Sequence, residues 1–337
     1  LAAGNWTGLY AGPMSQGSLD HAVIAYGGGV AEVPGSIAGF NALETQQADV
    51  RIANTVFEYN ADGTGGQAGS SREGRGQNSS ATVFVRGAQP LGVDNVLRGN
   101  EGPAISIDVN SLDFQLVTDR GRSTGLLGPL ANIVGNQGPL IRGNRLGDNA
   151  YNGMQVRGGT LTTQGVWDDT DIVHLLLDQT IHVPDFHTYG GLRLESSAAE
   201  SLVVKLFGDD AGFTATGRPL DITDRIGGML HIVGQPGHPV VLTSLYDDSI
   251  GAGFDPAGRP QTVTSKSPAL IQRLEVIEDV ADSGNTFVGP GVGVSTDGLG
   301  TADTGTLQAE IPLDATIERA YLHVATRNIR TAPALIL

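Results

Sequence analysis

The sequence predicts an all-β chain whose short strands stack in successive coils, and its composition is the first indication. Glycine accounts for 49 of 337 residues, about twice its ordinary share of ~7%, which favours tight turns over long helices. Hydrophobic residues make up 39% of the chain and aromatic residues only 5%. A core with so few rings must consist mainly of Val, Ile and Leu, which suit pleated strands.

The second indication is a short pattern in which two apolar residues flank a third residue. Alternate residues of a strand point to opposite faces, so the two apolar residues share the inner face. The middle residue is often Arg, Ser, Gln or His, which predicts a wet outer face. The pattern recurs in Val50-Arg-Ile52, Val83-Phe-Val85, Ile105-Ser-Ile107, Met154-Gln-Val156, Ile181-His-Val183, Leu192-Arg-Leu194 and Leu230-His-Ile232.

The third indication is repetition. The segment 99–105 returns as 135–141, at an offset of 36 residues, and paired asparagines recur along the chain. The pairs are Asn54 with Asn60, Asn95 with Asn100, and Asn144 with Asn149. Asparagines in stacked coils can hydrogen-bond from rung to rung and accept left-handed backbone angles. Because one coil cannot bury its inner face alone, the repetition predicts a solenoid. The alternative is an irregular antiparallel sandwich, against which hairpin signals are few.

Two stretches resemble a known class of repeats. Residues 48–158 include VRIANTVFEYNADG, VDNVLRGNEGPAISI and PLIRGNRLGDNAYNGMQVRG, and residues 165–253 include MLHIVGQPGHPVVLTSLYDDS. These segments resemble the right-handed parallel β-helix repeats of large bacterial surface and secreted proteins. The resemblance implies the fold but no particular activity, because this fold serves lyases, hydrolases, adhesins and inert stalks alike.

We therefore expect two regions. Residues 1–265 form a right-handed parallel β-helix with an N-terminal cap, its coils starting near residue 15, and residues 266–337 form a β-rich C-terminal segment. Within that segment, residues 283–305 are rich in Gly, Asp and Thr and are typical of a linker. Residues 305–327 look like the opening strands of a β-sandwich, which another molecule could complete by strand addition.

Charge and cysteine content exclude several classes of function. The 36 acidic and 20 basic residues give a net charge of −16, which disfavours nucleic acid and anionic membrane surfaces as partners. Cysteine is absent, which removes disulfides and thiolate chemistry. No apolar run approaches the ~18 residues of a membrane span. The chain begins at Leu1, which fits a processed product or a fragment, and we expect an extracellular or cell-surface location.

Acidic turns are the candidate metal sites, and calcium is the expected ion. They are Asp168, Asp169 and Asp171, Asp209 with Asp210, and Asp247 with Asp248. Calcium takes roughly six to eight oxygen ligands, which carboxylates and turn carbonyls can supply. No EF-hand loop or calcium-binding nonapeptide repeat is present. Solvated turns are the alternative, since Asp is common in turns.

A weak catalytic alternative rests on Arg193, Glu195 and Asp169. Lyases use an Arg or Lys base together with calcium, and hydrolases use paired carboxylates. Arg193 and Glu195 share one face of a strand, with Asp168 or Asp169 expected one coil away. Exposed Arg–Glu pairs are, however, common on strands, and no lyase, hydrolase or serine-nucleophile motif is present.

Three further patterns have plain structural explanations. The histidines are too scattered for zinc and are expected on the wet faces of separate rungs; they include His174, His182, His187, His231 and His238. The run of glycines at 27–29 lacks the Lys-Ser/Thr of a phosphate loop and predicts a turn. Asn78 begins a glycosylation acceptor pattern within a loop at 61–81.

The function expected from these observations is a non-catalytic structural or adhesive module of an exported protein. Such a module would self-associate or bind other surface proteins or polysaccharide, with calcium as a stiffening ion. Head-to-tail contacts that do not close give filaments. The alternatives are a polysaccharide lyase or glycoside hydrolase on the same scaffold, or a carbohydrate-binding module.

Overall fold

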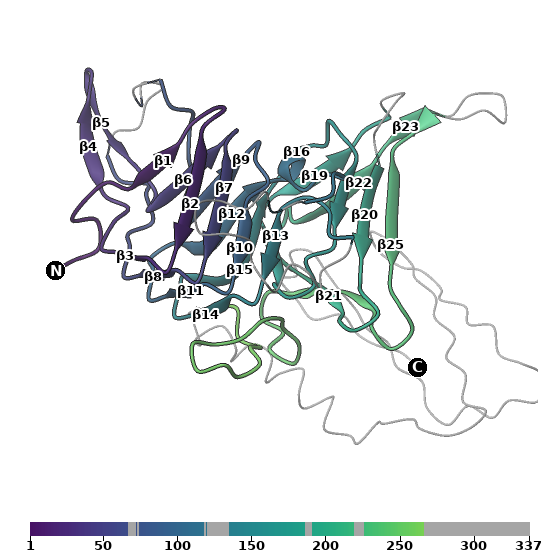
Figure 1. The fold of residues 1–337 in the computed structure, drawn as a ribbon. Helices are drawn as coiled ribbons and strands as arrows, with labels where there is room; N and C mark the ends of the chain where they lie inside the picture. The colour runs from purple at the N-terminus through teal and green to yellow at the C-terminus, as the bar shows by residue number, and fades with distance from the viewer. Residues whose placement is uncertain are drawn as a thin grey trace, which may run out of the picture. The chain divides into compact units, whose positions relative to one another are not determined.

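The computed structural model describes residues 1–66, 72, 74–117, 119, 135–185, 191–218 and 226–265. It divides the chain into two compact units, 1–276 and 277–337. The second unit lies outside the described residues, as does the β-rich segment expected over 266–337. Figure 1 shows the first unit, from its purple N-terminal strands to the green β25 (Met229–Val233).

Most of the regular structure consists of parallel strands, which form five sheets named here A to E. Sheet A contains β1 (Leu9–Ala11), β6 (Leu43–Gln46), β9 (Val83–Arg86), β12 (Pro103–Asp108), β15 (Tyr151–Arg157), β18 (His174–Leu177), β21 (Leu202–Phe207) and β26 (Val240–Ser244). Sheet B contains β2 (Gln16–Asp20), β7 (Asp49–Ala53), β10 (Leu91–Val93) and β13 (Leu140–Arg142). Sheet C contains β3 (Val23–Ala25), β8 (Val56–Glu58), β11 (Val96–Arg98) and β14 (Arg145–Gly147).

The remaining elements are shorter. Sheet D contains β16 (Gly159–Thr160), β19 (Thr180–Val183) and β22 (Gly212–Ala215), and sheet E contains β17 (Gly165–Trp167), β20 (Gly191–Glu195) and β25. Two antiparallel pairs are β4 (Val30–Val33) with β5 (Ser36–Gly39) and β23 (Gly217–Arg218) with β24 (Ile226–Gly227). One 3-10 helix, η1, spans Val109–Ser111. Within the described residues, no helix has the length and apolar character needed to span a membrane.

The chain visits the sheets in a fixed order. Up to β15 it passes through sheets A, B and C in turn, and from β15 onward it passes through A, D and E. Within each sheet, a strand pairs in parallel with the strand one round earlier, as Leu43 of β6 pairs with Leu9 of β1. This winding is compatible with a β-solenoid.

In-register pairing lines up inward residues in rows, and one such row passes through all of sheet A. This core row contains Leu9, Leu43, Val83, Ile105, Met154, His174, Val204 and Leu242. The six inner members are at most 5% exposed. Burying aliphatic side chains stabilises a fold by roughly 25 cal/mol per Å² of apolar surface, so such rows hold the coils together.

The corners between strands use residues that tolerate left-handed backbone angles. Between sheets B and C these are His21, Asn54 and Asp94, with φ of 52°, 49° and 57°. The N–H of Asn54 donates to the Val93 carbonyl at 3.1 Å, and the N–H of Asp94 donates to the Arg142 carbonyl at 2.9 Å. Because Gly, Asn and Asp accept such angles most readily, stacked corners account for the composition of the chain.

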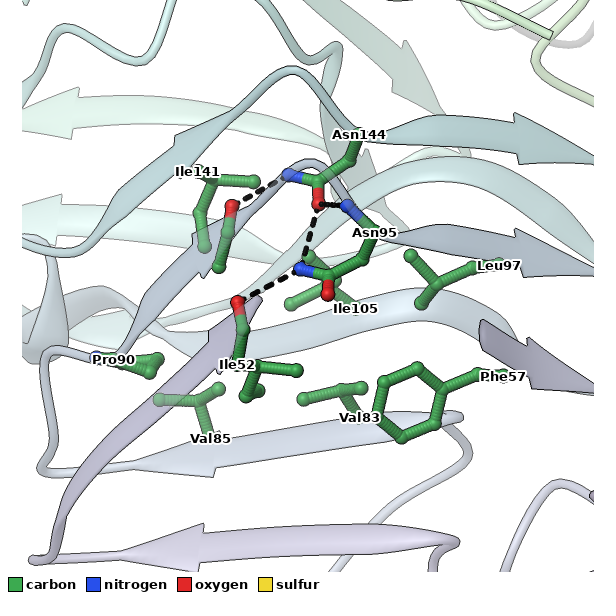
Figure 2. A pocket seen from close by; sticks show the side chains of 11 residues that line it. Ile52, Phe57, Val83, Val85, Pro90, Asn95, Leu97, Ile105, Ile141 and Asn144 are labelled. Carbon is green, nitrogen blue, oxygen red and sulfur yellow. Dashed lines mark hydrogen bonds between the residues drawn. The ribbon is translucent and has the colours of Figure 1, made fainter. Parts of the chain in front are cut away.

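Two ladders of buried asparagines join successive coils. In one ladder, Asn95 Nδ2 donates to Asn144 Oδ1 at 2.9 Å and to the Ile52 carbonyl at 3.0 Å (Figure 2). A cavity of about 20 Å³ lies beside these two side chains, roughly the space of one water. The other ladder contains Asn60, Asn100, Asn149 and Asn152. These amides satisfy backbone groups that the turns leave unpaired inside the stack.

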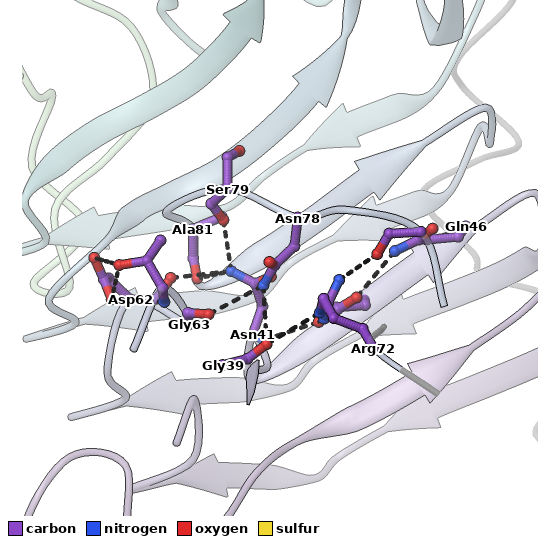
Figure 3. Close-up of polar contacts among 12 residues, drawn as sticks. Gly39, Asn41, Gln46, Asp62, Gly63, Arg72, Asn78, Ser79 and Ala81 are labelled. Carbon is purple, nitrogen blue, oxygen red and sulfur yellow. Dashed lines mark hydrogen bonds and ion pairs between the residues drawn. The ribbon is translucent and has the colours of Figure 1, made fainter. Parts of the chain in front are cut away.

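Near its N-terminal strands, the outer face of sheet A is covered by segments around Asp62, Arg72 and Asn78. Asn41 Nδ2 donates to the carbonyls of Asp62 at 3.0 Å and Ala81 at 2.8 Å, and Asn78 Nδ2 donates to Asn41 Oδ1 at 2.8 Å (Figure 3). Arg72 forms a buried ion pair with Glu44. The Asn78 amide, which begins the acceptor pattern noted in the sequence, is therefore part-buried and engaged in hydrogen bonds.

A strap formed by residues 246–265 covers the later strands of sheet A. The strap also covers the edge strand β14 of sheet C, where the Leu146 N–H donates to the Phe254 carbonyl at 2.7 Å. Under the strap, Lys205 Nζ donates to the Thr262 carbonyl at 3.0 Å and to Thr264 Oγ1 at 2.9 Å. The buried lysine is thus satisfied by strap oxygens.

The strand pattern of the sequence is confirmed, but three of its details are wrong. All seven apolar triplets lie in strands, yet the middle residues Arg51, Phe84 and Ser106 are at most 2% exposed because other segments cover their faces. Asn54 lies at a corner, and Thr55 takes the ladder position, its N–H donating to Asn95 Oδ1.

The third detail concerns repeat length and starting point. Leu91 pairs with Leu140, so equivalent positions in these coils lie 49 residues apart (140 − 91), not 36. The 36-residue match therefore relates strands of different sheets. The stack also begins at Leu9 rather than near residue 15, since β1 already pairs with β6.

Replacing Asn100 with Ala should destabilise the fold. Asn100 is fully buried, accepts from Asn60 and donates to the Phe57 carbonyl, so its loss leaves several buried polar groups unpaired. We expect the free energy of unfolding in urea to fall by about 3–5 kcal/mol. Asn110→Ala, which removes surface bonds to residues 160 and 162, should cost under about 1 kcal/mol. Equal losses would contradict the ladder's role.

Candidate functional site

The candidate residues gather where sheet B ends and sheet E begins. Sheet B stops at β13, because the chain enters sheets D and E after β15. β17 is followed directly by Asp168, Asp169 and Asp171. The next strand of sheet E, β20, carries Arg193 and Glu195.

The three aspartates of this turn accept hydrogen bonds from backbone N–H groups in and around β13. Asp168 Oδ2 accepts from Gln137 at 2.9 Å, and Asp169 Oδ1 accepts from Ile141 at 3.0 Å. Asp171 Oδ2 accepts from Gly143 at 2.6 Å. These carboxylates take the place of the carbonyls that a further strand of sheet B would supply.

Burial changes the protonation of these groups. It raises the pKa of Asp168 to about 7, and Glu195 adds a smaller repulsion that raises it further. It raises the pKa of Asp169 well above its ordinary value, with the neighbouring Asp168 adding to the effect. Burial also raises the pKa of Asp171. The turn therefore holds carboxyl groups that take up protons at unusually high pH.

An ion pair fastens the same turn to the following coil. Arg142 Nη2 donates to Glu200 Oε1 at 2.8 Å, and Thr170 Oγ1 donates to Glu200 Oε2 at 2.7 Å. The hydrogen bond to Glu200 raises the pKa of Arg142. Sequence reasoning missed this pair, because Arg142 and Glu200 are 58 residues apart and lie in no shared motif.

The proposed catalytic residues are only partly brought together. Arg193 and Glu195 form an ion pair on the exposed face of β20, and the charge of Glu195 acts on Asp168 rather than on Asp169. Asp169 is 4% exposed and bonded to Ile141. The residue that could share proton chemistry with Glu195 is therefore Asp168.

The second acidic pair behaves differently. Asp247 accepts from the Ser249 N–H at 3.0 Å and from Thr243 Oγ1 at 2.7 Å, an arrangement typical of an Asx turn. Burial raises the pKa of Asp248, and the nearby Lys205 opposes this. Over the described ranges, no group of three or more His, Asp or Glu side chains could hold a metal ion. Calcium binding at either cluster stays a prediction.

The histidines divide into two kinds. His182 and His231 are exposed, as expected, and His187 lies outside the described residues. His174 is fully buried in the core row, so its expected wet position is wrong. The apolar run that surrounds it, from Ile172 to Leu177, could have indicated this. The glycines at 27–29 lie outside any strand, between β3 and β4. A β-carbon on Gly28 would lie 2.3 Å from the Ala61 carbonyl oxygen.

Comparison with known proteins gives no family. No family model matches the chain, and neither a curated protein nor a solved structure matches it. The geometry described above is therefore the basis for proposing a function.

The variant Asp168→Asn should become more stable than the parent chain as the pH rises. An acid whose pKa is raised by folding stabilises the fold at low pH and loses that contribution as the pH passes its raised value, here about 7. Between pH 5 and pH 8 the difference in unfolding free energy should shift by about 1–3 kcal/mol in favour of the variant. The exposed Asp209→Asn serves as control and should show no such shift in chemical denaturation.

Proposed function

We propose that this chain is a non-catalytic structural module of an exported protein, a right-handed parallel β-helix that associates end to end with further copies. The observation that carries the proposal is the exposure of the core row at both ends. Leu9 is 38% exposed and Leu242 is 42% exposed, whereas every member between them is buried. Terminal repeats of stable solenoids normally carry polar caps, and apolar ends favour association.

The last coil supports the proposal most strongly. Ile232 pairs with the fully buried Leu194 and thus occupies an inward position, yet it is 46% exposed. An open hollow of about 430 Å³ lies beside it, lined by Ile232, Gly234, Gln235, Pro236, Pro239 and Val240. This is the surface that a following coil would cover.

The strand edges complement the apolar ends. Among the described strands, β1 and β26 are the two outermost members of sheet A, and all its pairs are parallel. A second copy placed head to tail would continue the sheet in the same direction. Such heterologous contacts build rings or filaments, and unpaired edges readily accept another strand.

An extracellular or surface location is part of the same proposal. Its support is the resemblance to exported β-helix repeats, together with a charge of −16 that disfavours nucleic acid. Recovery of the intact protein from the culture medium or the cell surface would support this location, and recovery only from the cytoplasm would refute it.

The rival function is a glycoside hydrolase or polysaccharide lyase, with a carbohydrate-binding module as a third possibility. One observation favours catalysis: burial raises the pKa of Asp168 to about 7, with Glu195 adding to the effect, and a carboxyl group with a raised pKa can act as a general acid. Release of reducing ends or unsaturated uronates from pectin, alginate or neutral glycans, abolished in Asp168→Asn, would establish the rival. Retention on a glycan array without turnover would indicate a binding module.

Sedimentation velocity tests end-to-end association. The parent chain should show a sedimentation coefficient that rises with concentration, and Ile232→Lys should weaken association on the order of tenfold or more, because it places a charge in the contact. Ile37→Lys is the matched control, since Ile37 is 44% exposed but lies on the β4–β5 hairpin. A parent chain that stays monomeric at every concentration would refute the proposal.

Calcium stabilisation is a subordinate part of the proposal. If one or two of the carboxylates of Asp168, Asp169 and Asp171 bind calcium together with turn carbonyls, binding must displace their protons, so the effect grows with pH. Millimolar calcium should raise the midpoint of thermal unfolding by about 5 °C at pH 8 and by less at pH 5. Asp169→Asn should remove this shift, and Asp248→Asn would reveal any share of the second cluster. An unchanged midpoint in the parent chain rules calcium out.

A further inference from the structure

His174 is the one polar member of the core row. It pairs with Met154 on one side and Val204 on the other, and all three are fully buried. Its ring stacks on Trp167 with centroids 5.1 Å apart and planes inclined by 11°. The ring of Phe213 also packs on Trp167, with its centroid 5.6 Å away. A titratable ring therefore occupies a position where the other coils place an aliphatic side chain.

Little around this ring favours a charge on it. Neither ring nitrogen of His174 makes a hydrogen bond of normal geometry within the described structure. The Ile172 carbonyl lies near enough to favour the protonated ring, but burial outweighs it and lowers the pKa of His174 to about 3. An imidazolium without a counter-charge in an apolar interior is strongly unfavourable.

The charged and titratable groups on the neighbouring strands are engaged elsewhere. On β15, Tyr151 packs under the strap, and Arg157 donates to Ser106 on the outer face of sheet A. On β21, Lys205 donates to Thr262 and Thr264 of the strap. The strands β17 and β22 carry no charged residue. No carboxylate from these elements reaches His174 to stabilise its protonated form.

The asparagine ladders do not extend to this part of the stack. The last ladder residue is Asn152, and no asparagine occurs between residues 153 and 265. The coils from β2 to β15 are thus joined by buried amides that do not titrate, in addition to ion pairs such as that of Arg98 with Glu58. Among the described residues, the coils after β15 have no such ladder, and the apolar contacts around Trp167 and His174 act there together with the pair of Arg142 and Glu200. Local stability differs between such regions.

We propose that protonation of His174 at mildly acidic pH favours local opening of the coils from β17 to β22, while the asparagine-bonded coils stay closed. A histidine whose pKa is lowered by folding stabilises the fold above its ordinary value of 6.5 and loses that contribution as the pH falls toward 3. The aspartates after β17 act in the opposite direction, because their raised pKa values favour the fold at low pH. The contribution of His174 to opening is therefore measured by comparing variants, because the pH profile of the parent chain combines both effects.

Fluorescence of Trp167 gives the test. In a Trp6→Phe background, Trp167 is the sole tryptophan, and acrylamide quenching reports its exposure. Between pH 7.5 and pH 4.5 His174 by itself should favour opening about 100-fold, while the aspartates oppose it equally in every variant. Quenching at pH 4.5 should therefore be greater in the background chain than after adding His174→Phe, which keeps an aromatic ring on Trp167, and the two should be alike at pH 7.5. Adding the exposed His231→Phe should leave the quenching of the background chain unchanged at both pH values.

Equal quenching at pH 4.5 with and without His174→Phe would overturn the proposal. Hydrogen exchange at pH 4.5 should show less protection of β18 and β21 in the background chain than in the His174→Phe variant, and equal protection of β9 and β12. If His174→Phe fails to fold, NMR titration of His174 in the unmodified chain supplies the answer, and a pKa near 6.5 would refute the proposal.

Discussion

The in-register parallel pairing of each strand with the strand one round earlier is the interaction on which the rest of this structure depends. It places like residues over like residues, so aliphatic side chains form continuous rows, asparagines form ladders, and left-handed corners form columns. Each of these is stabilised by its neighbours above and below and by little else. A core can therefore be built with few aromatic rings, because every rung adds the same small apolar contribution to one long stripe.

The same arrangement creates the features proposed to matter for function. A row has no natural end, so Leu9 and Leu242 remain exposed where the described stack stops. The polar side chain of His174 interrupts the row of apolar side chains at its middle, where no charged group of the described residues is seen to act on it. The proposed end-to-end association and the proposed acid sensitivity are thus both derived from one architecture, although neither depends on the other.

The acidic turn after β17 shows how a pattern in the sequence can serve two purposes. Clustered carboxylates suggested calcium, but three of them also replace the missing hydrogen-bond acceptors beyond β13. These acceptors are missing because the chain passes from sheets B and C to sheets D and E after β15. No local sequence pattern predicts this change. Burial then raises the pKa of Asp168 toward neutrality, which gives the rival catalytic function its one supporting observation.

The sequence by itself determined the all-β class, the inward residues of all seven apolar triplets and most of the asparagine ladders, because strand alternation and turn preferences are local properties. It could not determine which outer faces are wet, since Arg51 and Phe84 are buried by segments distant in sequence. It also misaligned the coils by treating residues 105 and 141 as equivalent, because loop lengths between coils vary and only strand pairing sets the register. The burial of His174, the pairing of Arg142 with Glu200 and the open ends of the core row were decided by the tertiary structure alone, since each depends on residues that meet only when the coils are stacked.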